Sequence, residues 1–336
     1  MLPNRVSQNH PRRRWPDVLA VVTALLAGSC AAPDASDSPA GPLRPAAVAM
    51  SPWDARYPNS RCVTTAHYRI YSDLQDADSL DQLAQAMEGA HQLYQSLCPG
   101  IPLSPKPLDC FIFARRAEWA AFTAKNTGND AAVYLQIDRG GYTVNDWFVA
   151  FWIGDRGTLA VAAHEGFHQY VARNFAGRLP PALEEGFACM FENIEFTGRL
   201  PRWDLRDNTT RQRALRQGLD ARMLWPLSTL IKMHAGEVIG MPRTRIEAFY
   251  AQNWALAMFF WEGDGRRYRP AIQRFMADAA AGKLWTPPGA AANSIRQWYP
   301  ELNQAVLEYY LNATFLELEP QFLGYANHLA ARHRDE

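Results

Sequence analysis

The chain has 336 residues, of which 48% are hydrophobic and 20% charged, and its 34 basic side chains balance its 34 acidic ones. This amount of apolar material suffices for one large domain or two small ones. Because the charges cancel and the basic residues are scattered, the composition argues against a nucleic-acid partner.

The first thirty residues have the pattern of an export signal. Four arginines precede the apolar run VLAVVTALLA, residues 18–27, which is too short to span a bilayer as a helix. The residues that follow, 26–30, resemble a bacterial lipobox, which implies that Cys30 is lipidated; cleavage at an A-x-A-like site is the alternative. We therefore expect signal peptide over 1–30 and an exported protein of the cell envelope or periplasm. Its membrane contact would be the N-terminal lipid anchor alone.

The next segment, residues 31–60, is rich in Ala, Pro, Ser and Asp and lacks a hydrophobic period. Such a composition predicts a solvated, disordered tether. The folded domain is therefore expected to cover residues 61–336.

The cysteines beyond Cys30 show no CxxC pair, which argues against a cysteine-based zinc site. In an oxidising compartment we expect one disulfide among Cys62, Cys98 and Cys110, with Cys189 buried and free. The sequence leaves the pairing open.

The first part of the domain, residues 61–157, shows the patterns of a small sheet with helices laid against it. Alternating or continuous apolar runs of four to ten residues predict strands, and apolar residues at helical spacing predict helices. The expected strands cover 64–73, 108–114, 131–137 and 146–154. The expected helices cover 79–97 and 118–124.

The second part, residues 158–336, is mainly helical in pattern, and glycine and proline separate its helices. The expected helices cover 158–175, 181–194, 210–219, 226–234, 245–261, 270–281 and 301–314. A sheet followed by helices predicts an α+β fold, with a small N-terminal mixed sheet and a mainly helical C-terminal part.

The sequence HEGFH places His164 and His168 four residues apart in a largely apolar segment. Residues four apart lie on one face of a helix, so both imidazoles can bind one metal ion. Glu165 follows the first histidine, where its carboxylate can reach a water molecule at the metal and act as a general base. This arrangement is typical of a mononuclear zinc hydrolase.

The apolar surroundings of these histidines favour a metal site over a chance match. Phe167 and Tyr170 indicate a buried helix, and a buried carboxylate beside two imidazoles is costly without a compensating cation. A catalytic zinc ion usually has three protein ligands. The segment LPPALEEGFACMFE, residues 179–192, offers Glu184 or Glu185 in the first turns of the next helix.

The pairing of HEGFH with LEEGFACMFE resembles the gluzincin metallopeptidases, the clan of thermolysin and the one-zinc aminopeptidases, and is similar to peptidase-MA-like secreted bacterial proteins of unknown function. The third ligand of that clan is the glutamate before glycine in L-x-E-G-x-A, and the matching residues are Leu183, Glu185, Gly186 and Ala188. The resemblance implies one zinc ion held by His164, His168 and Glu185, with Glu184 facing solvent. It also implies a thermolysin-like catalytic core, with the zinc site in the cleft between the sheet part and the helical part.

The resemblance carries further expectations and one departure. Tyr250 lies where one-zinc aminopeptidases keep a tyrosine that donates to the tetrahedral intermediate, although it can equally be a core tyrosine. Residues 146–154 lie where the clan has the edge strand that pairs with substrate. The G-x-M-E-N signature that anchors a free N-terminal amine is absent, and Cys189 replaces an acidic residue that orients a zinc histidine, so another group is expected to orient it.

These observations predict a zinc metallopeptidase that cleaves peptide or protein substrates with a metal-activated water and does not anchor a free N-terminal amine. The expected catalytic residues are Glu165 and Tyr250. The alternative is a non-catalytic, zinc-stabilised envelope module that binds peptide or glycan, and a third possibility is hydrolysis of a non-peptide amide. His67 and His91 lie outside any such motif and are expected to be structural.

Overall fold

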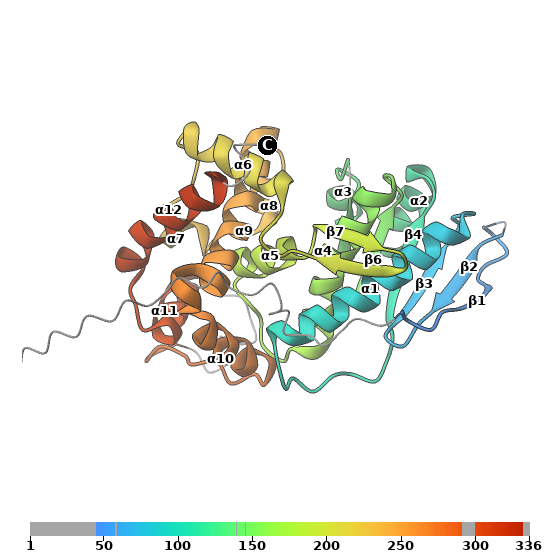
Figure 1. Ribbon diagram of the computed structural model, residues 1–336. Coiled ribbons are helices and arrows are strands. Elements are labelled where there is room, and N and C mark those ends of the chain that lie inside the picture. The colour runs from blue at the N-terminus through green and yellow to red at the C-terminus, as the bar shows by residue number, and fades with distance from the viewer. Residues whose placement is uncertain (1–44, 58, 139, 145, 291–299, 332–336) are drawn as a thin grey trace, which may run out of the picture. The chain divides into compact units, whose positions relative to one another are not determined.

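The computed structural model describes residues 45–57, 59–138, 140–144, 146–290 and 300–331. The expected signal peptide, the lipidation site Cys30 and the tether up to residue 44 lie outside the described residues. The described part is a mixed α+β structure with a six-stranded sheet on its N-terminal side and mostly helices on its C-terminal side (Figure 1). The predicted α+β class is therefore confirmed.

The sheet has the strand order β1-β2-β3-β4-β6-β5. Its strands are β1 (Ala49–Pro52), β2 (Arg61–Thr64), β3 (Tyr68–Ser72), β4 (Leu108–Phe113), β5 (Gly141–Val144) and β6 (Trp147–Phe151). The three central strands β3, β4 and β6 are parallel, and the outer pairs are antiparallel. β5 therefore forms the edge next to β6.

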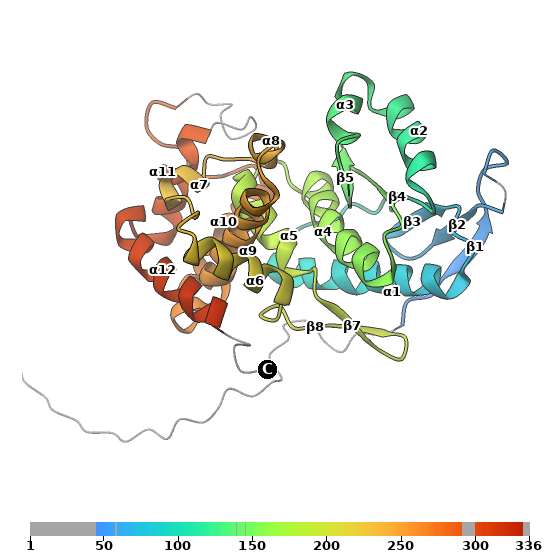
Figure 2. The ribbon, with the colours of Figure 1, turned by 90° about the horizontal axis from the view of Figure 1, so that it is seen from above.

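The central strands are buried on both faces, as parallel strands usually are. Along β4, Cys110 and Ile112 join the main core, whereas Phe111 and Phe113 join a second core with Trp119. This alternation follows from the two-residue period of a strand. The main core packs against α1 (Ala77–Leu97) and α4 (Asp155–Asn174), and the second against α2 (Arg116–Asn126). Figure 2 shows α1 and α2 on opposite sides of the sheet.

Helix α4 packs closely along α1 because a glycine separates the two histidines. A Cβ atom on Gly166 would lie 2.9 Å from the Tyr94 hydroxyl. That hydroxyl donates to the Ala163 carbonyl over 2.5 Å. The glycine of HEGFH therefore lets α1 approach the side of α4 opposite the histidines, which fixes the helix in place.

The C-terminal side is built around a long buried helix, α9, whose last turn is non-helical at residues 263–265. Its helices are α5 (Pro181–Met190), α6 (Thr209–Asp220), α7 (Leu227–Leu230), α8 (Ala235–Val238), α9 (Arg243–Arg266), α10 (Arg269–Ala280), α11 (Pro300–Leu311) and α12 (Phe315–Ala331). A hairpin of β7 (Ile194–Thr197) and β8 (Leu200–Trp203) follows α5. Among the described helices, none is both long and apolar enough to cross a membrane.

Helix α5 joins the two sides, because it packs against both α4 and α9. A Cβ atom on Gly186 would lie 2.2 Å from the Asn253 carbonyl oxygen, so only glycine allows this approach. The loop before α5 is held to the end of α10, since Ala176 N–H and Gly177 N–H donate to the carbonyls of Ala280 and Ala279. The position of α5 is thereby fixed from three directions.

Several predicted elements are wrong. Residues 131–137, expected as a strand, contain the one-turn helix α3 (Ala131–Tyr134), consistent with the helix propensity of its two alanines. The helix expected over 181–194 ends at Met190, and that expected over 226–234 is the single turn α7. Strand β6 lies inside the sheet, so the expectation that residues 146–154 form the edge strand is wrong; β5 takes that place.

The tether and disulfide expectations also need correction. β1 pairs with β2, and the Trp53 ring stacks on Tyr57, so the ordered structure begins before residue 61. The four cysteines of the described part are free thiols, and Cys189 is buried as expected. Cys62 on β2 and Cys110 on β4 are separated by β3, and two strand spacings of about 4.8 Å put them at least about 9.6 Å apart, too far for a disulfide.

Candidate metal site

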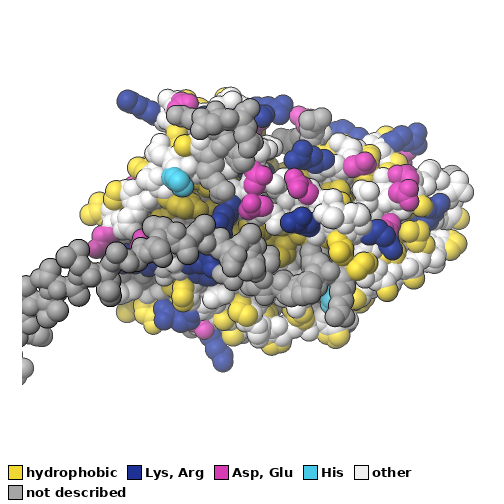
Figure 3. Space-filling view, in the orientation of Figure 1, with side chains coloured by type: hydrophobic (Ala, Val, Ile, Leu, Met, Phe, Trp, Pro, Cys, Tyr) yellow, Lys and Arg dark blue, Asp and Glu magenta, His cyan; other side chains and the backbone are white. Residues whose placement is uncertain are grey.

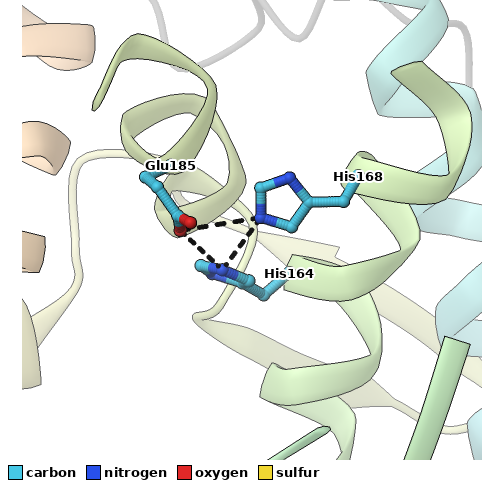
Figure 4. A group of neighbouring side chains, drawn as sticks. All are labelled: His164, His168 and Glu185. Atoms are coloured by element: carbon cyan, nitrogen blue, oxygen red, sulfur yellow. Dashed lines mark hydrogen bonds and ion pairs between the residues drawn. The ribbon is translucent and has the colours of Figure 1, made fainter. Parts of the chain in front are cut away.

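Two histidines and a glutamate converge at the contact between α4 and α5 (Figure 4). The Nε2 atoms of His164 and His168 are 3.3 Å apart. Glu185 Oε2 lies 3.2 Å from the first and 3.6 Å from the second. The three side chains are only 12–16% exposed. The structure therefore brings together the three residues expected as ligands, and they can hold a metal ion.

The donor atoms themselves fit a cation. Glu185 Oε2 is buried and, apart from its ion-pair contacts with the two imidazoles, has no hydrogen-bond partner among the described residues. Ligand bonds of about 2.0–2.1 Å in a tetrahedral zinc site place neighbouring donor atoms about 3.3 Å apart, close to the separations found here. Two imidazole nitrogens and a carboxylate are also a ligand set that zinc accepts. The geometry and chemistry of this group therefore fit a tetrahedral zinc ion.

Each histidine has a glutamate of its own at the other ring nitrogen. His164 Nδ1 lies 3.0 Å from Glu192 Oε1, and His168 Nδ1 lies 2.8 Å from Glu184 Oε1. A carboxylate at Nδ1 accepts a hydrogen bond from the Nδ1–H group and so keeps the proton there, which leaves Nε2 with a lone pair, the tautomer that binds metal. The expectation that Glu184 faces solvent is therefore wrong. Glu192 supplies the orienting group that Cys189 cannot.

The charges of this group favour a cation strongly. Burial opposes the charged form of His168, but Glu185 and Glu184 outweigh it and raise the pKa of His168 to about 10. Burial also favours neutral Glu185, yet attraction to the two imidazoles holds the pKa of that carboxyl well below its ordinary value. The group thus stabilises positive charge beside the Glu185 carboxylate, which a divalent metal ion also supplies.

Glu192 is itself neutralised by a buried arginine of α6. Arg211 Nε donates to Glu192 Oε2 over 2.8 Å, and a second guanidinium nitrogen donates to Oε1. The Asn208 amide also donates to Oε2. Burial raises the pKa of Glu192, but Arg211 and His164 outweigh it and lower the pKa well below its usual range. Glu192 therefore remains an acceptor for His164.

His164, Cys189 and Glu192 form a second group with metal-binding atoms close together. The Cys189 thiol lies 3.9 Å from His164 Nδ1. However, Glu192 is already paired with Arg211, and burial raises the pKa of Cys189. Glu192 therefore orients His164 and does not offer a free carboxylate to an ion.

Glu165 faces the edge strand of the sheet. The Thr143 hydroxyl, on β5, lies 2.9 Å from Glu165 Oε2 and 3.1 Å from the Glu165 carbonyl oxygen. The expected general base, Glu165, directly follows His164 in the sequence. Its carboxylate is held by a hydroxyl group from a neighbouring strand. No pattern in the sequence connected residue 143 with it.

Tyr250, on α9, lies near the metal-binding group. Its ring centroid is 6.3 Å from that of His164, and the Arg211 guanidinium carbon lies 5.1 Å from its ring centroid. Burial raises the pKa of Tyr250 well above its ordinary value, so the phenol keeps its proton and can donate a hydrogen bond. The structure therefore places the Tyr250 ring beside that of His164.

His67 and His91 lie away from this site, stacked on each other with ring centroids 4.0 Å apart. His67 Nδ1 pairs with Glu88 over 2.7 Å. No pattern in the sequence pointed to this acidic partner, because Glu88 comes from a different element, α1.

Comparisons of the chain with protein-family models, with curated proteins and with solved structures find no match. On the face of the molecule shown in Figure 3, basic and acidic side chains are interspersed.

Proposed function

We propose that the protein is a zinc-dependent peptidase of gluzincin type. The observation that carries this proposal is the convergence of His164 Nε2, His168 Nε2 and Glu185 Oε2 within 3.6 Å of one another, with Glu165 next in sequence to the first ligand. A metal site that serves only stability does not need that glutamate. When bound, one zinc ion would act as a Lewis acid toward a water molecule and a carbonyl group.

The side chains around this position divide the work of hydrolysis. The Glu165 carboxylate accepts a proton from the attacking water and passes it to the leaving amine. Thr143 holds one of its oxygens through the 2.9 Å contact and so limits its rotation. The Tyr250 hydroxyl donates to the oxygen on which negative charge develops.

The edge strand β5 is the place for an extended substrate backbone. An edge strand exposes unpaired N–H and C=O groups that can pair with a peptide. Thr143 belongs to this strand and contacts Glu165, so a peptide along β5 would pass the general base. This arrangement supports a peptide or protein substrate. It does not require a free N-terminal amine.

The location of the enzyme is also part of the proposal. The apolar run and the lipobox-like residues at the N-terminus support export and attachment of Cys30 to the cell envelope through lipid. The peptidase would then act on substrates outside the cytoplasm.

The test compares wild-type protein with Glu165→Gln on a diverse peptide library, with zinc content measured in the same samples. We expect one zinc ion per chain in both proteins and a loss of cleavage of at least about 1,000-fold in the variant, since the general base is removed. His168→Ala and Glu185→Ala should lose the metal.

Unchanged cleavage in the zinc-containing Glu165→Gln protein would disprove the mechanism. Zinc binding without cleavage of any peptide by the wild type would instead favour a binding module. Glu195→Gln, an exposed change on β7, is the matched control and should behave as wild type.

A further inference from the structure

The buried Arg211 guanidinium contacts both Glu192, which holds His164, and the Tyr250 ring. Arg211 lies on α6, in a segment that no sequence pattern associated with the site, and its side chain is only 17% exposed. It pairs through two nitrogens with Glu192, which in turn lies 3.0 Å from His164 Nδ1. The same guanidinium lies over the Tyr250 ring.

We propose that Arg211 is a positioning residue that sets the orientation of His164 through Glu192 and holds Tyr250 beside it. This inference rests in part on the proposed function, because Tyr250 matters only if the site is catalytic. The first part of the proposal, the orientation of His164 through Glu192, concerns metal binding alone.

The fork of the guanidinium is suited to this task. Its two donors fix the carboxylate plane of Glu192, so that Oε1 is directed to His164 while Oε2 accepts from Asn208. A planar guanidinium can at the same time lie against an aromatic face, which an ammonium cannot do equally well. Lysine at this position would keep the charge but lose both geometric constraints.

The structure contains a matched arginine outside the site. The Arg269 side chain is 16% exposed, pairs with Glu262, and lies 4.4 Å from the centroid of the Trp261 ring. Like Arg211, it is therefore a buried arginine with one carboxylate partner and one aromatic partner. Its guanidinium donates to Glu262 and to the Trp261 carbonyl, away from His164, His168 and Glu185.

The experiment measures zinc affinity by chelator competition for wild type, Arg211→Lys, Glu192→Gln and the double variant. Loss of an outer partner of a metal-binding histidine typically costs 10- to 100-fold in affinity. We expect a loss of about this size for Arg211→Lys, and little further loss when it is added to Glu192→Gln, because both act through one contact. Arg269→Lys should bind zinc as the wild type does.

A folded Arg211→Lys protein with wild-type zinc affinity, or with a loss that adds fully to that of Glu192→Gln, would overturn the proposal. If Arg211→Lys does not fold, Arg211→Ala is assayed with guanidinium and, as the matched ion, methylammonium. Recovery of zinc affinity with guanidinium alone supports the proposal. Failure of guanidinium to restore zinc affinity overturns it.

The second part of the proposal, that Arg211 holds Tyr250 in place, is tested by measuring kcat and KM on a cleaved peptide. With zinc at saturating concentration, Tyr250→Phe should lower kcat more than it raises KM, and Arg211→Lys should lower kcat little further in that background. A full additional loss of kcat in the double variant would show that Arg211 does not act through Tyr250. If the wild type cleaves no peptide, the proposed function fails, and the zinc competition alone decides the role of Arg211.

Discussion

Glu184 Oε1 lies 2.8 Å from His168 Nδ1, while the next residue, Glu185, has its Oε2 atom 3.6 Å from Nε2 of the same ring. Two consecutive glutamates of α5 therefore act on opposite nitrogens of one imidazole. Glu185 would be a ligand to the proposed metal, and Glu184 holds the ring that would supply a second ligand atom.

Replacement of Glu184 should weaken metal binding without removing it. Glu184→Gln keeps the size of the side chain but loses the charge that holds the proton on Nδ1, so zinc affinity should fall by about 10- to 100-fold. Chelator competition gives the value. Glu185→Gln should lose far more, and equal losses for the two variants would contradict their assigned roles.

The Thr143 hydroxyl should matter for turnover and not for zinc. Thr143→Val removes the 2.9 Å contact to Glu165 and leaves the carboxylate free to rotate, so kcat should fall roughly 10- to 100-fold. Thr143→Ser keeps the hydroxyl and should retain most activity. The measurements are kcat on a cleaved peptide and zinc stoichiometry. An altered stoichiometry in Thr143→Val would place Thr143 with the metal ligands instead.

Gly186 should tolerate no side chain. Gly186→Ala would put Cβ 2.2 Å from the Asn253 carbonyl and push α5 from α9, costing about 1–3 kcal/mol in the free energy of unfolding. Gly324 on α12 is the control, because nothing lies within 4 Å of a Cβ atom there, and Gly324→Ala should stabilise by about 0.5–1 kcal/mol. Denaturant unfolding measures both. A Gly186→Ala protein of wild-type stability would be incompatible with this helix contact.

His91 should destabilise the protein in acid. Burial, reinforced by repulsion from His67, lowers the pKa of His91 from 6.5 to about 4, so the unfolded chain takes up the proton more readily than the folded one. The free energy of unfolding should therefore fall between pH 6.5 and pH 4. The stability lost through His91 over this range would approach about 3 kcal/mol.

The neighbouring His67 acts with the opposite sign. Its hydrogen bond to Glu88 raises the pKa of His67, which contributes stability below pH 6.5 that is lost as the pH rises through the folded value. The contribution of His91 is isolated by comparing wild type with His91→Phe at each pH. A pH dependence that is identical in the two proteins would show that His91 does not titrate as inferred.

The residues that the sequence predicted best are those fixed by local spacing. The helix that carries HEGFH and the helix that carries Glu185 both occur, because an apolar period of 3.6 residues and a proline at the start of α5 are local signals. The edge strand was misplaced because β5 has only four residues and no strong alternation. Its position depends on pairing with β6.

The outer partners of the histidines were missed for a different reason. Glu192 lies just beyond the end of α5, and Arg211 lies on another helix. Neither has a fixed spacing from His164 that a pattern can detect. Glu184 was expected to face solvent because the resemblance makes Glu185 the ligand. Only the packing of α5 across α4 brings both glutamates to one ring.

The donor atoms come from two helices that meet only in the folded chain, so the proposed zinc ion would bind the native state and have little affinity for the unfolded one. Under this thermodynamic linkage, free zinc at 1,000 times its Kd would add about 4 kcal/mol to the stability of the fold. The melting temperature would then report zinc occupancy even where no substrate is known. In a compartment poor in zinc, the same chain would have a lower free energy of unfolding.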